Sequence, residues 1–250
     1  MKSFAVIAAL LMGLVGPVQA QQVDPIESPL WDYMRKLFIG DAEYQFDENI
    51  KVIVPEFAED PTQVPVTIDA SAYDGQIERI VSWADLNPIQ HIFTYHPHAD
   101  VIPRMSLRIK VQQGTAVRAA VLTKDGMWHV GSSYVDAAGG GCTTPSTGNA
   151  NPYWESHLGE MKSRLFPQEQ GGRYKLKIIH PMDTGLVNAI PEFYIEQVVV
   201  RSAKGDDLAK MELSQPVSEN PVLTFDVRHA DRKHSIWMRD NSGNEFEKQL

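Results

Sequence analysis

Residues 116–142 read AVRAAVLT-KDG-MWHVGSSYV-DAAGGGC, two β-rich runs about a short turn, followed by a glycine arm that ends at Cys142. The turn contains Asp125-Gly126, and an Asp-Gly pair between such runs is a strong β-hairpin signal. Similar short runs, separated by Pro and Gly, recur at 51–55, 64–69, 76–83, 89–95, 105–111, 161–166, 173–180, 192–201, 208–213, 222–228 and 235–239. Strands at this spacing predict an all-β chain of two immunoglobulin-like β-sandwich domains.

A short helix is predicted before the first sandwich, over residues 28–40. Ser28 suits the cap, Pro29 the first turn and Gly40 the end of this helix. Its apolar face would consist of Leu30, Met34, Leu37 and Phe38. Such a stripe more often docks on a core than on a partner, so we expect the helix to pack against a sandwich.

The composition along the chain predicts five segments. Residues 1–20 form a signal peptide, 21–48 an N-terminal helical segment, and 49–142 a β-sandwich that ends in the Gly-Cys arm. Residues 143–160 are rich in Thr, Ser, Asn, Pro and Gly and predict a linker. Residues 161–250 form the second β-sandwich.

The first twenty residues have the pattern of a secretory signal. Lys2 precedes an apolar run over residues 4–15, and Val18-Gln19-Ala20 is a typical cleavage site. The run is too short to favour a membrane span. We therefore expect an exported protein, cleaved after Ala20, in a bacterial periplasm.

Composition and motif content argue against several functional classes. The net charge of −9 disfavours nucleic-acid binding, which needs clusters of Lys and Arg. No dinucleotide-binding, Walker-type, Cys-x-x-Cys or haem-attachment motif is present. The sequence therefore assigns no catalytic residue and no cofactor.

Cys142 is the only cysteine, so it cannot form an internal disulfide. It follows Gly139, Gly140 and Gly141, which make the backbone slender and flexible. Six extended residues of this arm would span roughly 20 Å, enough to carry the sulfur into a cleft on another protein. We expect an exposed thiol; the alternative is a small, buried and inert cysteine.

The local sequence does little to activate the thiol. No Lys, Arg or His lies within five residues of Cys142, and Asp136 disfavours ionisation. This pattern indicates a passive carrier whose natural adducts are persulfides and mixed disulfides, formed by thiolate attack or exchange. In an oxidising compartment an exposed lone thiol also allows two chains to join through a Cys142–Cys142 disulfide.

Several motifs of the second half occur in a recognisable order. They are His180-Pro181-Met182-Asp183-Thr184-Gly185, the strand over 195–200, Ser218-Glu219-Asn220-Pro221 and Trp237-Met238-Arg239-Asp240-Asn241. In these motifs residues 162–250 resemble SoxZ, the non-thiol subunit of the SoxYZ sulfur carrier. The resemblance implies an immunoglobulin-like fold.

The first half has its own ordered motifs: Val64-Pro65-Val66, Asn87-Pro88, the strand over 105–111, Asp125-Gly126 and the arm that ends at Cys142. They resemble the SoxY family, in which sulfur intermediates are carried on a cysteine in a glycine-rich C-terminal tail. The resemblance implies that Cys142 is the covalent attachment site and that Gly139, Gly140 and Gly141 form its flexible arm. This arm departs from the family because it is internal and because no Gly-Gly follows Cys142.

The order of the halves, the helix near Trp31 and the internal cysteine resemble the fused SoxYZ-like carriers associated with quinoprotein dehydrogenases. The resemblances to SoxY and SoxZ imply a non-catalytic carrier that meets enzymes of sulfur (thiosulfate) oxidation, and the resemblance to the fused carriers adds enzymes of a quinoprotein dehydrogenase system as candidate partners. The resemblances to SoxY and SoxZ also imply that the halves pack against each other, with the strand over 195–200 as one candidate face. An internal arm must enter a partner as a hairpin or lie across a groove.

Two other functional classes compete with the carrier hypothesis. The chain could be a docking protein for a periplasmic quinoprotein (alcohol) dehydrogenase, in which Cys142 has no sulfur chemistry. Alternatively, His91, His96 and His98 could bind copper or zinc. No closed ligand set of known spacing accompanies these histidines, so we assign no metal site.

Overall fold

The computed structural model describes residues 23–98, 100–146 and 153–250. The predicted signal peptide and the middle of the predicted linker lie outside these residues. Within the described ranges, two helices, α1 (Trp31–Phe38) and α2 (Tyr153–His157), and two 3-10 turns, η1 (Ser71–Tyr73) and η2 (Gly141–Thr143), accompany the strands. None of the described helices is long and apolar enough to cross a membrane.

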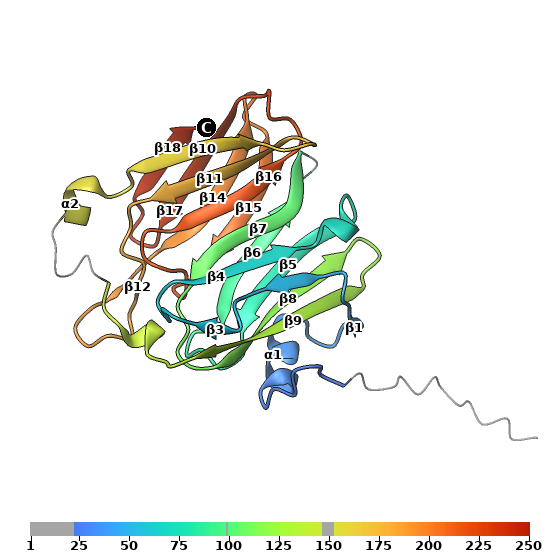
Figure 1. The fold of residues 1–250 in the computed structure, drawn as a ribbon. Helices are drawn as coiled ribbons and strands as arrows, with labels where there is room; N and C mark the ends of the chain where they lie inside the picture. The colour runs from blue at the N-terminus through green and yellow to red at the C-terminus, as the bar shows by residue number, and fades with distance from the viewer. Residues whose placement is uncertain (1–22, 99, 147–152) are drawn as a thin grey trace, which may run out of the picture.

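The strands form two layers, visible as a front and a back sheet in Figure 1. The larger sheet has the order β1-β9-β8-β5-β6-β15-β14-β17-β18, with β3 also paired to β9. Its strands are β1 (Tyr44–Phe46), β3 (Phe57–Ala58), β5 (Ile77–Ala84), β6 (His91–Pro97), β8 (Thr115–Thr123), β9 (Trp128–Ala137), β14 (Ile195–Ser202), β15 (Asp207–Leu213), β17 (His234–Asp240) and β18 (Glu245–Gln249). The predicted Asp125-Gly126 hairpin is present as the antiparallel pair β8–β9.

The smaller sheet has the order β10-β11-β16-β7-β4-β2. Its strands are β2 (Lys51–Ile53), β4 (Val64–Asp69), β7 (Val101–Ile109), β10 (Met161–Pro167), β11 (Gly172–Ile178) and β16 (Val222–Val227). A separate short ribbon joins β12 (Asp183–Thr184) to β13 (Glu192–Phe193). The prediction of an all-β chain built of immunoglobulin-like sandwiches is confirmed.

Both sheets continue from the first half of the chain into the second. β6 pairs with β15 in the larger sheet, and β7 pairs with β16 in the smaller one, both antiparallel. We call this double strand pairing the seam. The strand over 195–200 is not the contact face, because β14 lies one strand beyond β15. Backbone pairing in both layers explains why a side-chain pattern could not identify the interface.

Side chains between the layers form a core that runs through the seam. β7 alternates strictly, with Val101, Pro103, Met105, Leu107 and Ile109 buried and the residues between them less so. Such alternation is what one buried sheet face requires. Apolar side chains from both halves, from Ile50 to Met238, form one continuous cluster, so the halves do not have separate cores.

The N-terminal segment packs on the outer face of the larger sheet. Trp31 and Met34 of α1 are buried, and Trp31 stacks at 6.4 Å on Trp83 of β5. Leu37, which we predicted on the buried face, is instead exposed, because the face against the sheet is centred on the larger Trp31 ring. The Ser28 side chain does not cap the helix, which begins after Leu30.

A buried network of ion pairs attaches the N-terminal segment to the larger sheet. The Arg118 side chain, wholly buried in β8, contacts Asp24 at 2.6 Å and Asp85 at 3.0 Å. Its guanidinium also lies 4.6 Å from the Trp31 ring centre. Asp24, close to the start of the described residues, is therefore tied to the centre of β8.

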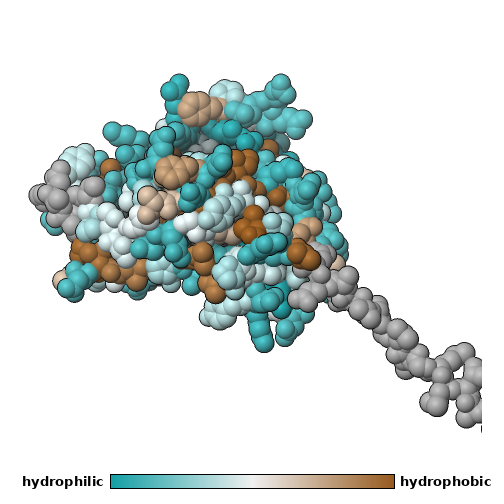
Figure 2. All heavy atoms as spheres, turned by 60° about the horizontal axis from the view of Figure 1, so that its bottom comes forward, coloured by the Kyte–Doolittle hydropathy of each residue, from teal (hydrophilic) through white to brown (hydrophobic). Residues whose placement is uncertain are grey.

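The surface is mainly polar, with apolar side chains in several separate patches on the face shown in Figure 2. In the part of the chain that the structure describes, the large exposed apolar residues are Val23, Tyr33, Leu37, Ile53, Phe57, Tyr134, Tyr153 and Leu186. They come from distant parts of the chain, and they identify no single docking face.

Candidate functional site

Cys142 is buried, so the prediction of an exposed thiol is wrong. Only 1% of the residue is accessible, and its Sγ–H donates to the Lys110 carbonyl at 3.5 Å. The alternative of a small buried cysteine describes its position. The Gly-rich flank misled the prediction because glycines also allow a backbone to fit tightly against another backbone.

The glycine arm is bound to the sandwich beyond the end of β9. The Gly140 amide donates to the Gln112 carbonyl at 3.1 Å, and the Gly141 amide donates to the Val111 carbonyl at 3.0 Å. A Cβ at Gly141 would lie 2.1 Å from the Pro61 carbonyl oxygen, so only glycine fits there. The arm is thus docked, in what we call the closed arm, rather than extended into solvent.

The second half of the chain completes the closed arm. Thr184 Oγ1, from β12, donates to the Cys142 carbonyl at 2.8 Å. Lys110 immediately follows β7, and its ammonium donates to the Met182 carbonyl. The His180–Gly185 motif therefore forms one wall of the cysteine site, which lies at one end of the seam.

Burial controls the acidity of the two central groups. It raises the pKa of the Cys142 thiol to about 11, although the nearby Lys110 charge lowers it. Burial also lowers the pKa of Lys110 to about 8, against the opposing effects of Asp183, Cys142 and Glu219. The thiol of the closed arm is therefore neutral at physiological pH and protected from reaction.

His180 supports the wall behind this site. It is fully buried, its Nδ1 accepts from the Met182 amide at 3.2 Å, and its Nε2 lies 3.6 Å from Asp240. Burial lowers the pKa of His180, which keeps the ring neutral and its Nδ1 able to accept. Met182 has a φ of 52°, so this accepted hydrogen bond holds a left-handed turn.

The three histidines considered for metal binding do not converge. Both ring nitrogens of His91 contact hydroxyls, Ser214 Oγ at 2.5 Å and Thr94 Oγ1 at 2.9 Å. Within the described ranges, no group of three or more His, Cys, Asp or Glu side chains is arranged to hold a metal ion. His91 has a structural role between β6 and the loop after β15.

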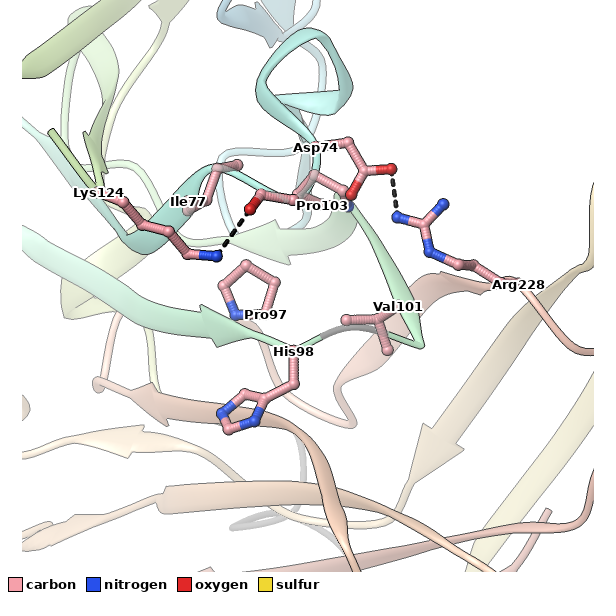
Figure 3. A pocket seen from close by; sticks show the side chains of 9 residues that line it. Asp74, Ile77, Pro97, His98, Val101, Pro103, Lys124 and Arg228 are labelled. Carbon is pink, nitrogen blue, oxygen red and sulfur yellow. Dashed lines mark hydrogen bonds and ion pairs between the residues drawn. The ribbon is translucent and has the colours of Figure 1, made fainter.

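A cleft of about 390 Å³ lies at the opposite end of the seam (Figure 3). Its charged groups Lys124, Arg228 and Asp74 have partners: Lys124 Nζ donates to the Gly75 carbonyl at 2.8 Å, and Arg228 pairs with Asp74. Val101 begins β7 at this end and Lys110 follows β7 at the other, nine residues further along the chain, roughly 30 Å. The cleft therefore does not serve the cysteine directly.

The sequence identified Cys142 but not the groups that surround it. Lys110, Asp183 and Thr184 lie 32, 41 and 42 positions away in the chain, beyond any local window. Lys110 gave no local signal of its own. It continues the polar alternate positions of β7, which include Arg104 and Arg108, so the pattern predicts an outward-facing side chain, whereas the structure buries Lys110.

Two sequence families match the chain in succession. The SoxY family, described as Sulfur oxidation protein SoxY, matches residues 34–142. The SoxZ family, described as Sulphur oxidation protein SoxZ, matches residues 167–250. No curated protein is similar enough in sequence to count as a match.

Solved structures give more distant similarities. The sulfur carrier protein SoxY from Chlorobium limicola f thiosulfatophilum is 22% identical, with a TM-score of 0.38 over 44% of this chain and 96% of that one. A BSP domain of a biofilm-associated protein is 9% identical, with a TM-score of 0.24 over 80% of this chain and 28% of that one. A β-glucuronidase from Parabacteroides merdae is 8% identical, with a TM-score of 0.24 over 82% of this chain and 25% of that one.

On the two successive family matches, the chain is a fused SoxYZ-like protein, with a SoxY-family half followed by a SoxZ-family half in one polypeptide.

Proposed function

We propose that this protein is an exported, non-catalytic carrier that holds sulfur-containing groups covalently on Cys142. The observation that carries the proposal is the position of this residue. Cys142 is the only cysteine, it is the last residue of the SoxY-family match, and it is docked at the seam with the SoxZ-family half. Both families are named for sulfur oxidation.

The closed arm implies a cycle of opening and closing. In the closed arm the thiol is buried and its pKa is raised to about 11, so the attacking thiolate forms after the arm leaves the seam. The open thiolate attacks a sulfur atom of the donor, a new S–S bond forms, and the donor's leaving group departs with the electron pair. Gly139 and Gly140, both at positive φ, are the natural hinges of this movement.

Location and partners follow from the same proposal. The predicted signal peptide directs the protein to the periplasm, where sulfur-oxidation enzymes or enzymes of a quinoprotein dehydrogenase system load and unload the arm. Those enzymes receive the arm as a hairpin, because the chain continues past Cys142 into the second half. A Cys142–Cys142 dimer would require both arms to be open.

The intact mass of protein purified from the periplasm tests this function. We expect a reducible added mass of sulfur on the wild-type chain and none on Cys142→Ser. The added mass identifies the cargo, and doubling of the chain mass would identify the disulfide dimer. An unmodified thiol on protein taken from cells that are actively oxidising sulfur compounds would contradict the carrier function.

Burial of Cys142 favours one alternative, a docking protein for a periplasmic quinoprotein dehydrogenase without sulfur chemistry. The same variant separates the two functions. In a docking protein Cys142→Ser keeps both partner affinity and cellular activity, because a serine fills nearly the same buried volume. In a carrier the variant loses all activity, because the hydroxyl cannot hold the sulfur group.

A further inference from the structure

The Cys142 site contains a buried cation. Lys110 is only 4% exposed, and its ammonium lies on the wall that faces the arm, bonded to the Met182 carbonyl. Its own carbonyl accepts from the Cys142 thiol. A lysine is rarely buried to this extent unless its charge is used or paired.

The hydrogen-bonding capacity of this cation is not filled. An ammonium has three N–H donors, and in the described part of the chain the Lys110 ammonium has one hydrogen-bond partner, Met182. Asp183 and Glu219 act on it electrostatically, yet burial still lowers its pKa to about 8. A further negative charge in the site would therefore stabilise the ammonium, and the neutral Cys142 thiol does not supply one.

We propose that Lys110 is the charge partner of the group carried on Cys142, so that the closed arm retains an anionic adduct in preference to a neutral or cationic one. This inference rests on the carrier function proposed above and adds the residue that selects among adducts by their charge. Persulfides and sulfonate-terminated chains are examples of anionic adducts. Lys110 is a positioning residue in this role, because it exchanges no bond with the cargo.

Three synthetic adducts of the full chain separate charge from bulk. Tetrathionate places –S–SO₃⁻ on the Cys142 thiolate and releases thiosulfate. Methyl methanethiosulfonate places the similarly compact, neutral –S–CH₃ and releases methanesulfinate. Aminoethyl methanethiosulfonate places a cationic –S–CH₂CH₂–NH₃⁺ and releases the same sulfinate. Intact mass confirms that each reaction is complete.

The measurement is the rate at which dithiothreitol removes each adduct at neutral pH. The same rate is measured on Gly141→Ala, in which the arm cannot dock. The protection factor of an adduct is its removal rate on Gly141→Ala divided by its removal rate on the wild-type chain, so the intrinsic reactivity of the adduct cancels. We expect this protection factor to be about tenfold or more larger for the anionic adduct than for the neutral one, and smallest for the cationic one. The Lys110 charge acts on Cys142 electrostatically, and attraction between opposite charges in a buried site is strong enough for such a difference.

Variants of Lys110 test whether its charge causes the difference between the three protection factors. Lys110→Met, which keeps the length and removes the charge, should bring the three protection factors together, whereas Lys110→Arg should keep their order. Equal factors for the three adducts on the wild-type chain would overturn the proposal without any variant. So would an undiminished preference for the anion in a folded Lys110→Met.

These measurements do not depend on which group the cell attaches to Cys142. Because the adducts are synthetic, a charge preference at Cys142 is measurable even on protein that carries no native sulfur. Absence of native adduct with a preserved preference would overturn the carrier function alone. Native adduct without a charge preference would overturn the role of Lys110 alone.

Discussion

Gly141→Ala is expected to increase the rate of Cys142 alkylation by iodoacetamide up to about 100-fold at neutral pH. The added methyl would lie 2.1 Å from the Pro61 carbonyl oxygen and 2.6 Å from that of Val111. Both are backbone atoms that cannot yield easily, so the turn at Gly141–Thr143 must leave its place. The thiol then regains its ordinary pKa instead of about 11, and two pKa units raise the thiolate fraction about 100-fold.

The pH dependence of the Cys142 alkylation rate should also differ between the wild-type chain and Gly141→Ala. Since the closed arm raises the thiol pKa, it binds more protons than the open arm between about pH 9 and 11, and closure weakens as the pH rises through that window. The alkylation rate of the wild-type chain should therefore continue to rise towards pH 11. In Gly141→Ala it should level off near pH 9.

Thr143→Ser is the matched control, because it alters an exposed neighbour of Cys142 and keeps the hydroxyl. It should react at the wild-type rate. If Gly141→Ala and the wild-type chain react equally fast, the thiol is already accessible in solution and the closed arm does not govern its reactivity.

Arg118→Met is expected to lower the free energy of unfolding by about 3–5 kcal/mol, the usual cost of removing one partner from a buried ion pair. Arg118 and Asp85 are wholly buried, and Asp24 nearly so. Without the guanidinium, Asp85 keeps the Trp83 indole N–H, at 2.8 Å, but loses its counter-charge. Asp24 loses the anchor that ties the N-terminal segment to β8. Urea unfolding measures the change.

Two further variants separate this effect from general damage. Lys210→Met removes an exposed pair with Glu212 at 3.6 Å and should cost less than about 1 kcal/mol. Asp85→Asn combined with Arg118→Met should be less destabilising than the sum of the single changes, because no uncompensated charge remains at that position. A loss for Arg118→Met no larger than that of Lys210→Met would show that Asp85 and Asp24 do not depend on the guanidinium.

Local patterns were sufficient for most of the longer strands and for singling out Cys142, which we propose as the attachment residue. The Asp125-Gly126 turn specified the β8–β9 hairpin, and strict alternation in residues such as Met105, Leu107 and Ile109 specified which face of β7 is buried. Both signals arise from neighbours in the chain and need no knowledge of distant contacts. Cys142 was evident because it has no other cysteine to pair with.

The same local view failed where the outcome depended on distant contacts. The glycines before Cys142 allow a free arm and a tightly docked one equally, and only the carbonyls of Pro61 and Val111 decide between them. Leu37 has the right spacing for the buried face of α1, yet the Trp31–Trp83 stack sets the rotation of the helix.

The sequence by itself determined the all-β class, the order of the two halves and the one residue that can carry a sulfur group. The tertiary structure alone decided that both sheets run across the seam and that Cys142 is buried there, beside Lys110 and Thr184. The reason is physical. Strand periodicity and a unique thiol are properties of adjacent residues, whereas burial, charge and acidity at Cys142 arise from groups that folding brings from both halves of the chain.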